Sequence, residues 1–372
     1  MSSGRRALAT VLDRRGALMS LFGLVLAPYA ARAGSPARRL HALFPGTRML
    51  PWLRLSSWPT PLEEHASLAK ALGVGRLFVK RDDRAGAAYG GSKLRKLELL
   101  LADAEARGHR GVATQGGVAS NQTLATAFFA KQRGLAAQLF LLPERPSAAA
   151  RAHLLAQAAL GAEQRLVGSE AQAGRAIARL AERPYVIPTG GSSALGNAGF
   201  VEAGLELAEQ VKPDAVYLPL GTGGSAVGLA LGLQTARADA EVVAVRTASP
   251  RFGTPSLLRR AAREMSSLLH ALDPAFASTD RLPRLRVREG FVGKGYAEPT
   301  ASGRRMRDLA RAEAGLELDL TYSAKALAAL AADAPKLRDK SVVFWLTYDA
   351  REVPSGTAKV SDLPRALRAY AR

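Results

Sequence analysis

A lysine follows two glycines and a serine where a helix is predicted to begin, in the segment Gly90-Gly91-Ser92-Lys93. Glycine lets the backbone approach a ligand closely. A partly desolvated lysine amine is the group that forms a Schiff base with a carbonyl compound. An ordinary loop-to-helix junction with a solvated lysine fits this segment equally well, so its interpretation depends on other parts of the chain.

A second loop places polar side chains at the start of another predicted helix. It runs from Gln115 to Gln122 and contains Ser120 and Asn121, both good helix-capping residues. The first N–H groups of a helix have no partner within the helix, and the helix dipole favours an anion there. A substrate carboxylate fits this position, although a simple capped helix explains the same residues.

A third loop joins a predicted strand to a predicted helix through Gly221-Thr222-Gly223-Gly224-Ser225. A glycine loop of this kind presents backbone N–H groups to a phosphate. It lacks the Gly-Lys-Ser/Thr ending of a nucleotide P-loop and matches a dinucleotide fingerprint only loosely. The next strand ends in Val245-Arg246-Thr247, with no acidic residue to bind a ribose. One phosphate is therefore better supported than a dinucleotide.

The composition argues against two classes of function, metal binding and nucleic-acid binding. The 372 residues contain no cysteine, and the five histidines have no ligand-like spacing, so no metal site is predicted. The net charge of +20 is spread along the predicted helices without an arginine-rich tract or an aromatic-interleaved basic patch. Nucleic-acid binding is therefore not expected, although a basic surface alone would permit it.

Residues 1–38 differ from the rest and resemble an export signal. Arg14-Arg15 and earlier arginines precede an apolar run from Gly16 to Ala30, which is followed by the small-x-small site Ala31-Arg32-Ala33. The run is too short for a stable membrane span. We expect export to the periplasm with cleavage after Ala33, and the arginine pair is compatible with the twin-arginine route. A cytoplasmic protein with an additional surface helix is the alternative.

From about residue 45 onward, predicted strands and helices alternate, which is typical of parallel sheets with helices on both faces. A less regular region is expected at 273–295. Strands are predicted at 76–80, 111–114, 136–142, 185–187, 215–220, 242–246 and 341–347, and helices at 93–106, 120–133, 148–160, 169–180, 225–236, 256–272, 302–314 and 324–332.

With the three loops in this order, the chain resembles the pyridoxal-phosphate enzymes of the tryptophan-synthase-β type (fold type II), in the branch of D-cysteine desulfhydrase and 1-aminocyclopropane-1-carboxylate (ACC) deaminase. The resemblance covers about residues 50–347. Further matching segments are Pro59–Leu62, Val79–Asp83, Ile187–Ser192 with Gly196, Gly293–Ala297 and Asp319–Lys325. It implies two α/β domains, each a twisted and mostly parallel sheet flanked by helices. The large cofactor-binding domain would comprise 39–96 and 188–372, and the small domain 97–187.

The resemblance also implies residue roles. Lys93 would carry the Schiff base with pyridoxal 5′-phosphate and later move the α-proton. The loop Gly221, Thr222, Gly223, Gly224 and Ser225 would hold the phosphate. At the cofactor, it places Asn121 at the 3′ oxygen and Thr347 nearby. At the substrate, it places Ser120 and Gln122 at the carboxylate, with Asn121 also in contact. Tyr296 and Tyr322 would face the substrate, and Ser323 would bind it.

The choice within the branch depends on Ser323 and Thr347, where the deaminase type has Glu and Leu. A carboxylate near the pyridine nitrogen makes a stronger electron sink than a hydroxyl. Opening a cyclopropane needs the stronger sink, whereas expelling a thiolate needs less. The expected activity is therefore β-elimination from a D-amino acid such as D-cysteine, giving a keto acid, ammonia and sulfide, in a homodimer.

Several residues depart from the family pattern. Ser92 replaces an Asn, Leu320 a Pro and Ala324 a Gly, and the family's His-Thr-Gly-Gly is Leu346-Thr347-Tyr348-Asp349 here. Two large residues in place of glycines would crowd the cofactor ring or force this loop outward. ACC deamination and a non-catalytic ligand-binding protein on the same scaffold therefore remain alternatives.

Overall fold

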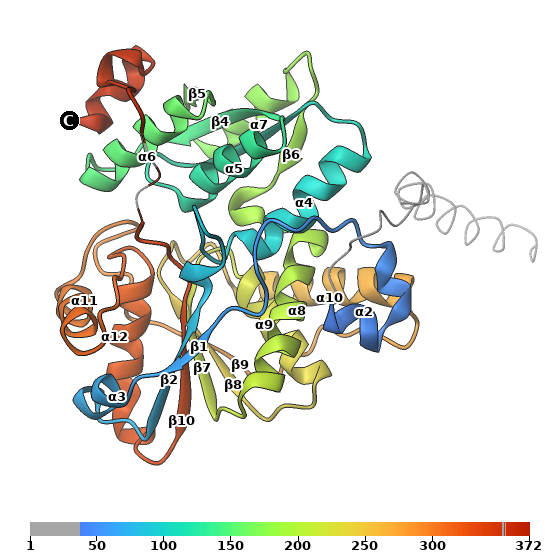
Figure 1. The fold of residues 1–372 in the computed structure, drawn as a ribbon, viewed down its shortest axis with the longest axis vertical. Helices are drawn as coiled ribbons and strands as arrows, with labels where there is room; N and C mark the ends of the chain where they lie inside the picture. The colour runs from blue at the N-terminus through green and yellow to red at the C-terminus, as the bar shows by residue number, and fades with distance from the viewer. Residues whose placement is uncertain (1–37, 352, 354) are drawn as a thin grey trace, which may run out of the picture.

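Two sheets organise the chain in the computed structural model, which describes residues 38–351, 353 and 355–372 (Figure 1). The signal-like segment and the cleavage site expected after Ala33 lie outside these residues, so export stays a prediction. Among the described residues, no helix combines the length and the apolar character needed to cross a bilayer.

The larger sheet has six strands in the order β1-β2-β10-β7-β8-β9. All neighbouring pairs are parallel except β1–β2, which puts one antiparallel strand at the edge. The strands are β1 (Leu62–Glu64), β2 (Arg76–Arg81), β7 (Ala215–Leu220), β8 (Glu241–Arg246), β9 (Leu285–Arg288) and β10 (Ser341–Leu346). Strand β10, near the end of the chain, therefore lies in the middle of this sheet.

Side chains alternate between the two faces of the larger sheet, as a strand requires. Val343 and Trp345 of β10 pack toward α8, α9 and α10, whereas Val342 and Phe344 pack toward α3, α11 and α12. These two groups of helices cover opposite faces of the sheet (Figure 1). Their bounds are α8 (Ala194–Gln210), α9 (Gly224–Thr235), α10 (Pro255–Leu272), α3 (Ala66–Leu72), α11 (Ala301–Ala314) and α12 (Ser323–Asp333), with the short α2 (Arg39–Leu43) beside α8.

The smaller sheet has four parallel strands in the order β5-β4-β3-β6. Its strands are β3 (Gly111–Gly117), β4 (Ala136–Leu142), β5 (Glu163–Leu166) and β6 (Tyr185–Ile187). One face packs against α5 (Asn121–Gln132) and α6 (Ala148–Ala159), and the other against α7 (Glu170–Ala178). Helix α4 (Leu94–Ala106) contacts both α5 and α8 and so joins the two sheets.

The two-sheet α/β architecture is confirmed, although the short elements α2, α3, β1 and β5 were not predicted and three further differences are larger. Helix α8 was not predicted, and β9 lies in the region that we expected to be irregular. The last residues, predicted in the larger domain, instead form a 3-10 helix (Arg365–Ala371) that packs on α6, with Leu367 in the core beside the smaller sheet. The remaining domain limits stay a prediction.

A buried charge network lies beneath the start of α4. Arg95 donates to both oxygens of Asp82, at 2.7 and 2.9 Å, and to both oxygens of Glu206, at 3.0 and 3.1 Å. Lys80 pairs with Glu206 from the other side and donates to the Thr60 carbonyl oxygen at 2.7 Å. Arg95, Asp82, Glu206 and Lys80 are all at most 2 % exposed. Each charge therefore has a partner, as burial requires.

Candidate active site

The carboxyl ends of parallel strands from both sheets meet at one cavity of about 370 Å³. This is where open α/β sheets bind ligands, because the loops there leave helix N-termini and backbone groups free. The strand ends reach the cavity through Gly117 at the end of β3, Glu144 after β4, Gly168 after β5, Thr189 after β6, Gly221 after β7, Ala248 after β8 and Thr347 after β10.

Most of the predicted site residues line this cavity, although they come from loops far apart in the sequence. They are Lys93, Ser120, Asn121, Gln122, Gly221, Thr222, Gly223, Ser225, Tyr296, Tyr322 and Thr347. Their roles remain predictions, but the fold places them around one space.

Lys93 immediately precedes α4 and is the N-cap residue of this helix. Among the residues that the structure describes, none accepts a hydrogen bond or forms an ion pair with its amine. Burial lowers the pKa of Lys93 to about 8. About a tenth of the amine is therefore uncharged at pH 7, far more than for an ordinary lysine, and this is the form that attacks a carbonyl carbon.

The glycine loop after β7 forms an anion cradle. Gly223 has φ +96° and precedes α9, so the first N–H groups of this helix face the loop. The Thr222 hydroxyl lies 2.6 Å from that of Ser192. Lys96 donates to Ser192 Oγ at 2.9 Å and to the Gly190 carbonyl oxygen at 3.2 Å. This buried lysine was not predicted. A signal was available, because Lys96 is three residues after Lys93 and so lies on the same side of the helix.

The start of α5 offers a second place for an anion. Ser120 caps the helix by accepting from the N–H of Gln122 at 3.2 Å. Within the described part of the chain, the Asn121 N–H has no hydrogen-bond partner. The Gln122 Oε1 atom is buried and likewise unpartnered there. The Asn121 N–H can donate to a carboxylate or a ring oxygen, whereas Gln122 Oε1 can accept from a donor group of a ligand.

Glu144 is a further cavity residue that the sequence analysis missed. Its Oε2 accepts from the Ala119 N–H at 3.0 Å, directly before the start of α5. Burial raises the pKa of Glu144, and the Ala119 hydrogen bond opposes only part of this rise. A carboxylate therefore lies close to the position predicted for the carboxylate of a substrate.

Two tyrosines stand together on the cavity wall. The hydroxyl of Tyr296 is hydrogen-bonded to that of Tyr322, and the rings meet edge to face with centroids 5.9 Å apart. Burial and the neighbouring Tyr296 raise the pKa of Tyr322. Both hydroxyls therefore keep their protons at neutral pH and can donate one.

Two predicted residues do not line the cavity. Ser323 is fully buried, and its hydroxyl donates to Asp319 Oδ2 at 2.7 Å because Asp319 caps the start of α12. It is therefore not placed to contact a substrate. Gly224 faces α8, since a Cβ on it would overlap the side chain of Asn197. After β10, Thr347 lines the cavity but Tyr348 and Asp349 do not, so the large residues do not crowd it.

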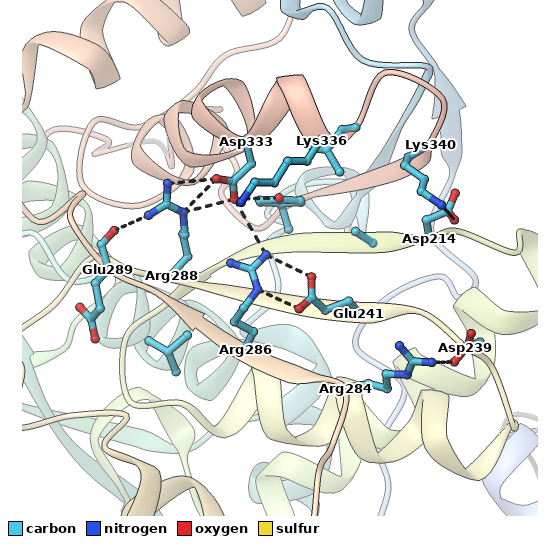
Figure 2. Close-up of a pocket in the computed structure, with 14 residues that line it drawn as sticks. Asp214, Asp239, Glu241, Arg284, Arg286, Arg288, Glu289, Asp333, Lys336 and Lys340 are labelled. Atoms are coloured by element: carbon cyan, nitrogen blue, oxygen red, sulfur yellow. Dashed lines mark hydrogen bonds and ion pairs between the residues drawn. The ribbon is translucent and has the colours of Figure 1, made fainter.

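A wider hollow of about 880 Å³ lies at the opposite, amino-terminal end of the larger sheet (Figure 2). Its charges are matched in pairs: Arg286 with Glu241, Arg288 with Asp333, Arg284 with Asp239 and Lys340 with Asp214. With Lys336 and Glu289 it carries five cations and five carboxylates. Balanced pairs at the surface do not favour a ligand of either sign.

The cavity fits the cofactor that the resemblance implies. It contains an unpaired amine for the aldehyde, an anion cradle for the phosphate, and a helix start for a second anion. The cradle is also closely shaped, because a Cβ on Gly190 would lie 2.9 Å from Thr222 Oγ1. Lys93, Lys96, Thr222, Gly223 and Ser225 are the residues that would hold pyridoxal phosphate.

We expect Gly223→Ala to weaken binding of pyridoxal phosphate by about ten-fold or more. The residue has φ +96°, and the added Cβ would lie 2.6 Å from Leu258 Cδ2, so the loop must move. Equilibrium dialysis with the phosphate cofactor measures the change. Gly134→Ala is the matched control, because it has φ +69° but open space around it. Equal affinities in the two variants would contradict the assignment of the cradle.

Comparison with known proteins agrees with the assignment of a pyridoxal-phosphate site. Residues 53–347 match the family model described as pyridoxal-phosphate dependent enzyme. The chain is 35% identical over 320 residues to nocardicin C-9′ epimerase of Nocardia uniformis subsp. tsuyamanensis, covering 82% of this chain and 94% of the relative. It is 32% identical over 320 residues to D-cysteine desulfhydrase of Yersinia pestis (strain Pestoides F), covering 80% and 92%.

A solved structure also matches. The crystal structure of an ACC deaminase homologue superposes with a TM-score of 0.73 at 28% identity, covering 90% of this chain and all of the other. The similarity therefore extends over both sheets.

Proposed function

Because the chain belongs to the pyridoxal-phosphate-dependent enzymes, we propose that it is a lyase acting on D-cysteine or a similar small D-amino acid. The reaction would convert D-cysteine and water into pyruvate, ammonia and hydrogen sulfide. The observation that carries the proposal is the placement of the unpaired Lys93 amine in one cavity with the phosphate cradle and the start of α5. The bound cofactor supplies an electron sink that stabilises negative charge at the substrate α-carbon.

The residues of the cavity would then have separate tasks. Lys93 holds the cofactor and, once released from it, takes the α-proton. The Asn121 N–H donates to the substrate carboxylate, and Gln122 Oε1 accepts from a donor group of the substrate. Tyr322, whose raised pKa keeps its hydroxyl protonated, donates a hydrogen bond to the departing sulfur, with Tyr296 holding its hydroxyl. The similarity to D-cysteine desulfhydrase supports this assignment.

ACC deamination is the second candidate, supported by the similarity to the ACC deaminase homologue. The argument against it from Ser323 is weaker in the structure, because this hydroxyl is bonded to Asp319. Thr347, in contrast, does line the cavity. The choice between the two activities therefore depends on a direct assay.

The purified protein, loaded with pyridoxal phosphate, should be given D-cysteine, L-cysteine and ACC in parallel, with sulfide, ammonia and keto acid measured. We expect all three products from D-cysteine and none from Lys93→Ala. Ammonia and keto acid from ACC alone would establish the deaminase. Loss of optical activity without products would indicate epimerisation, the activity in the name of the Nocardia relative. No reaction with bound cofactor would favour the ligand-binding alternative.

We expect Glu144→Gln to lower the KM for the amino acid by about five-fold at pH 8 with little change in kcat. Removing a like charge near the substrate carboxylate relieves a repulsion of about 1 kcal/mol. Because the pKa of Glu144 is raised, the wild-type carboxyl becomes neutral as the pH falls, and the two KM values should converge there. Steady-state kinetics from pH 5 to 8 tests this. The exposed Glu182→Gln should show no such effect.

We also propose that the protein forms a homodimer and that residues 1–33 direct its export. Light scattering of the purified protein tests the first. Amino-terminal sequencing of the protein from fractionated cells tests the second, with a new terminus at Gly34 in the periplasmic fraction as the expected result.

A further inference from the structure

The chain after β10 folds onto the turn that carries Lys93. Asp349 is 6 % exposed, and its Oδ2 accepts from the Gly90 N–H at 2.6 Å. One residue further along the turn, a Cβ on Gly91 would lie 3.2 Å from the Thr347 carbonyl oxygen. The Ser92 N–H donates to that same oxygen at 3.0 Å. The residues just before Lys93 are therefore bound from one side by residues 347–349.

Arg351 extends this contact along the same loop. Its Nη1 donates to the Ala87 carbonyl oxygen at 2.6 Å, and its Nη2 donates to the carbonyl oxygens of Gly86 at 2.7 Å and Asp83 at 3.1 Å. Its Nε and Nη2 also donate to the Asp349 carboxylate, at 2.9 and 2.7 Å. The planar guanidinium thus joins Asp349 to three backbone carbonyls, which a lysine amine could not do in the same way.

We propose that Asp349 and Arg351 are positioning residues that fix the turn 83–92 and so set the place of the Lys93 amine. This pair of residues is called the clip below. Asp349 occupies a position where the chain departs from the glycines of the family pattern, so the clip is a property of this chain. It acts through the backbone and contacts neither substrate nor cofactor.

The proposal rests on Lys93 being the cofactor lysine and has a functional consequence. An amine held in place reaches the aldehyde in the correct geometry, whereas an amine on a loose turn must find that geometry anew each time. Releasing the clip should therefore slow covalent capture more than it weakens binding of the phosphate group. The cradle after β7 is a separate element and stays intact.

The test compares Asp349→Ala, Asp349→Asn and wild type as apo proteins. Each is mixed with pyridoxal phosphate, and the rate at which the visible, borohydride-reducible band forms is followed by stopped flow. We expect Asp349→Ala to be roughly ten-fold slower, because the Gly90 N–H and the Arg351 fork lose a charged acceptor. Asp349→Asn keeps an acceptor oxygen and should recover much of the rate. Hydrogen exchange of peptides within 83–92 should quicken in the alanine variant.

Asp362→Ala is the matched control. Asp362 also accepts a backbone N–H, that of Lys359 at 2.8 Å, but lies in the carboxy-terminal segment away from Lys93. Equal capture rates for Asp349→Ala and wild type, with both proteins folded, would overturn the proposal. A lower unfolding temperature with unchanged capture would overturn it too, since the role would then be structural alone. Failure of the proposed function would appear differently, as absent turnover by a wild-type protein that captures the cofactor normally.

Discussion

Lys93→Ala is expected to form no borohydride-reducible complex with pyridoxal phosphate and to retain about one thousandth or less of the wild-type turnover. Under the proposed function, the variant loses both the covalent attachment and the base at the α-carbon. The phosphate cradle is untouched, so non-covalent cofactor binding should persist at reduced affinity. Absorption spectra with and without borohydride measure the first effect, and product assays measure the second.

The control for this experiment is Lys70→Ala, an exposed lysine on α3 that should behave as wild type. A band that persists in Lys93→Ala would mean that another lysine is the attachment site, and the nearby buried Lys96 is the first candidate. Peptide mapping after reduction distinguishes the two. In wild type, the rate of capture should rise with pH through about 8, because the uncharged amine of Lys93 is the reactive form and burial lowers its pKa to that value.

Arg95→Ala is expected to cost about 3–5 kcal/mol of unfolding free energy. Removing the guanidinium leaves Asp82 and Glu206 buried with a single cation, Lys80, beside them. The space between the rings of Trp58 and Trp345, which Arg95 fills, is also left partly empty. Urea unfolding followed by tryptophan fluorescence measures the change.

Arg107→Ala provides the comparison on the same helix, because its ion pair with Asp103 is partly exposed and should contribute at most about 0.5 kcal/mol to the unfolding free energy.

The buried network also predicts that the protein loses stability in acid. Burial alone would raise the pKa of Glu206, but Arg95 and Lys80 lower it to about 2. Its contribution to stability is complete above the ordinary value of 4.5 and is lost as the pH falls toward 2. Equal losses of unfolding free energy in Arg95→Ala and Arg107→Ala would contradict this account of the network.

The sequence was a good guide where loops combine a strand end with a helix start. The three loops at Lys93, Ser120 and Gly221 were placed from capping and glycine patterns, and the structure brings them to one cavity. The reason is topological, because the carboxyl ends of parallel strands share an edge. The pattern could not show what else lies at that edge, such as Glu144, whose loop has no motif.

Helix α8 was missed because its glycines resemble a loop. Gly199 and Gly204 lower helix propensity, but here they allow close packing: a Cβ on Gly199 would overlap the Arg95 carbonyl oxygen, and one on Gly204 would lie 2.8 Å from the backbone of Gly232. Strand β9 was missed because it is a four-residue edge strand rich in arginine. In both cases tertiary contacts outweigh local preference.

Ser323 shows that a residue at a family position need not be placed for the role which that position has in the family. The residue matches a family site, but its hydroxyl is engaged by Asp319, a local capping contact that the spacing did not reveal. Asp349 shows the opposite case. It was expected either to crowd the cofactor ring or to force the loop outward, and in the structure it lies outside the cavity lining and binds the Gly90 N–H.

The central place of β10 has a consequence for how the protein is made. Its residues pair with β2, so that Ser341 lies opposite Arg76, and with β7 on the other side. During synthesis, β2 and β7 therefore cannot lie in one continuous sheet until residues 341–346 have been made. The four-stranded sheet is continuous from Gly111 to Ile187 and can form long before that. We therefore expect the nascent chain to carry one complete sheet and one with open strand edges, and such edges favour aggregation.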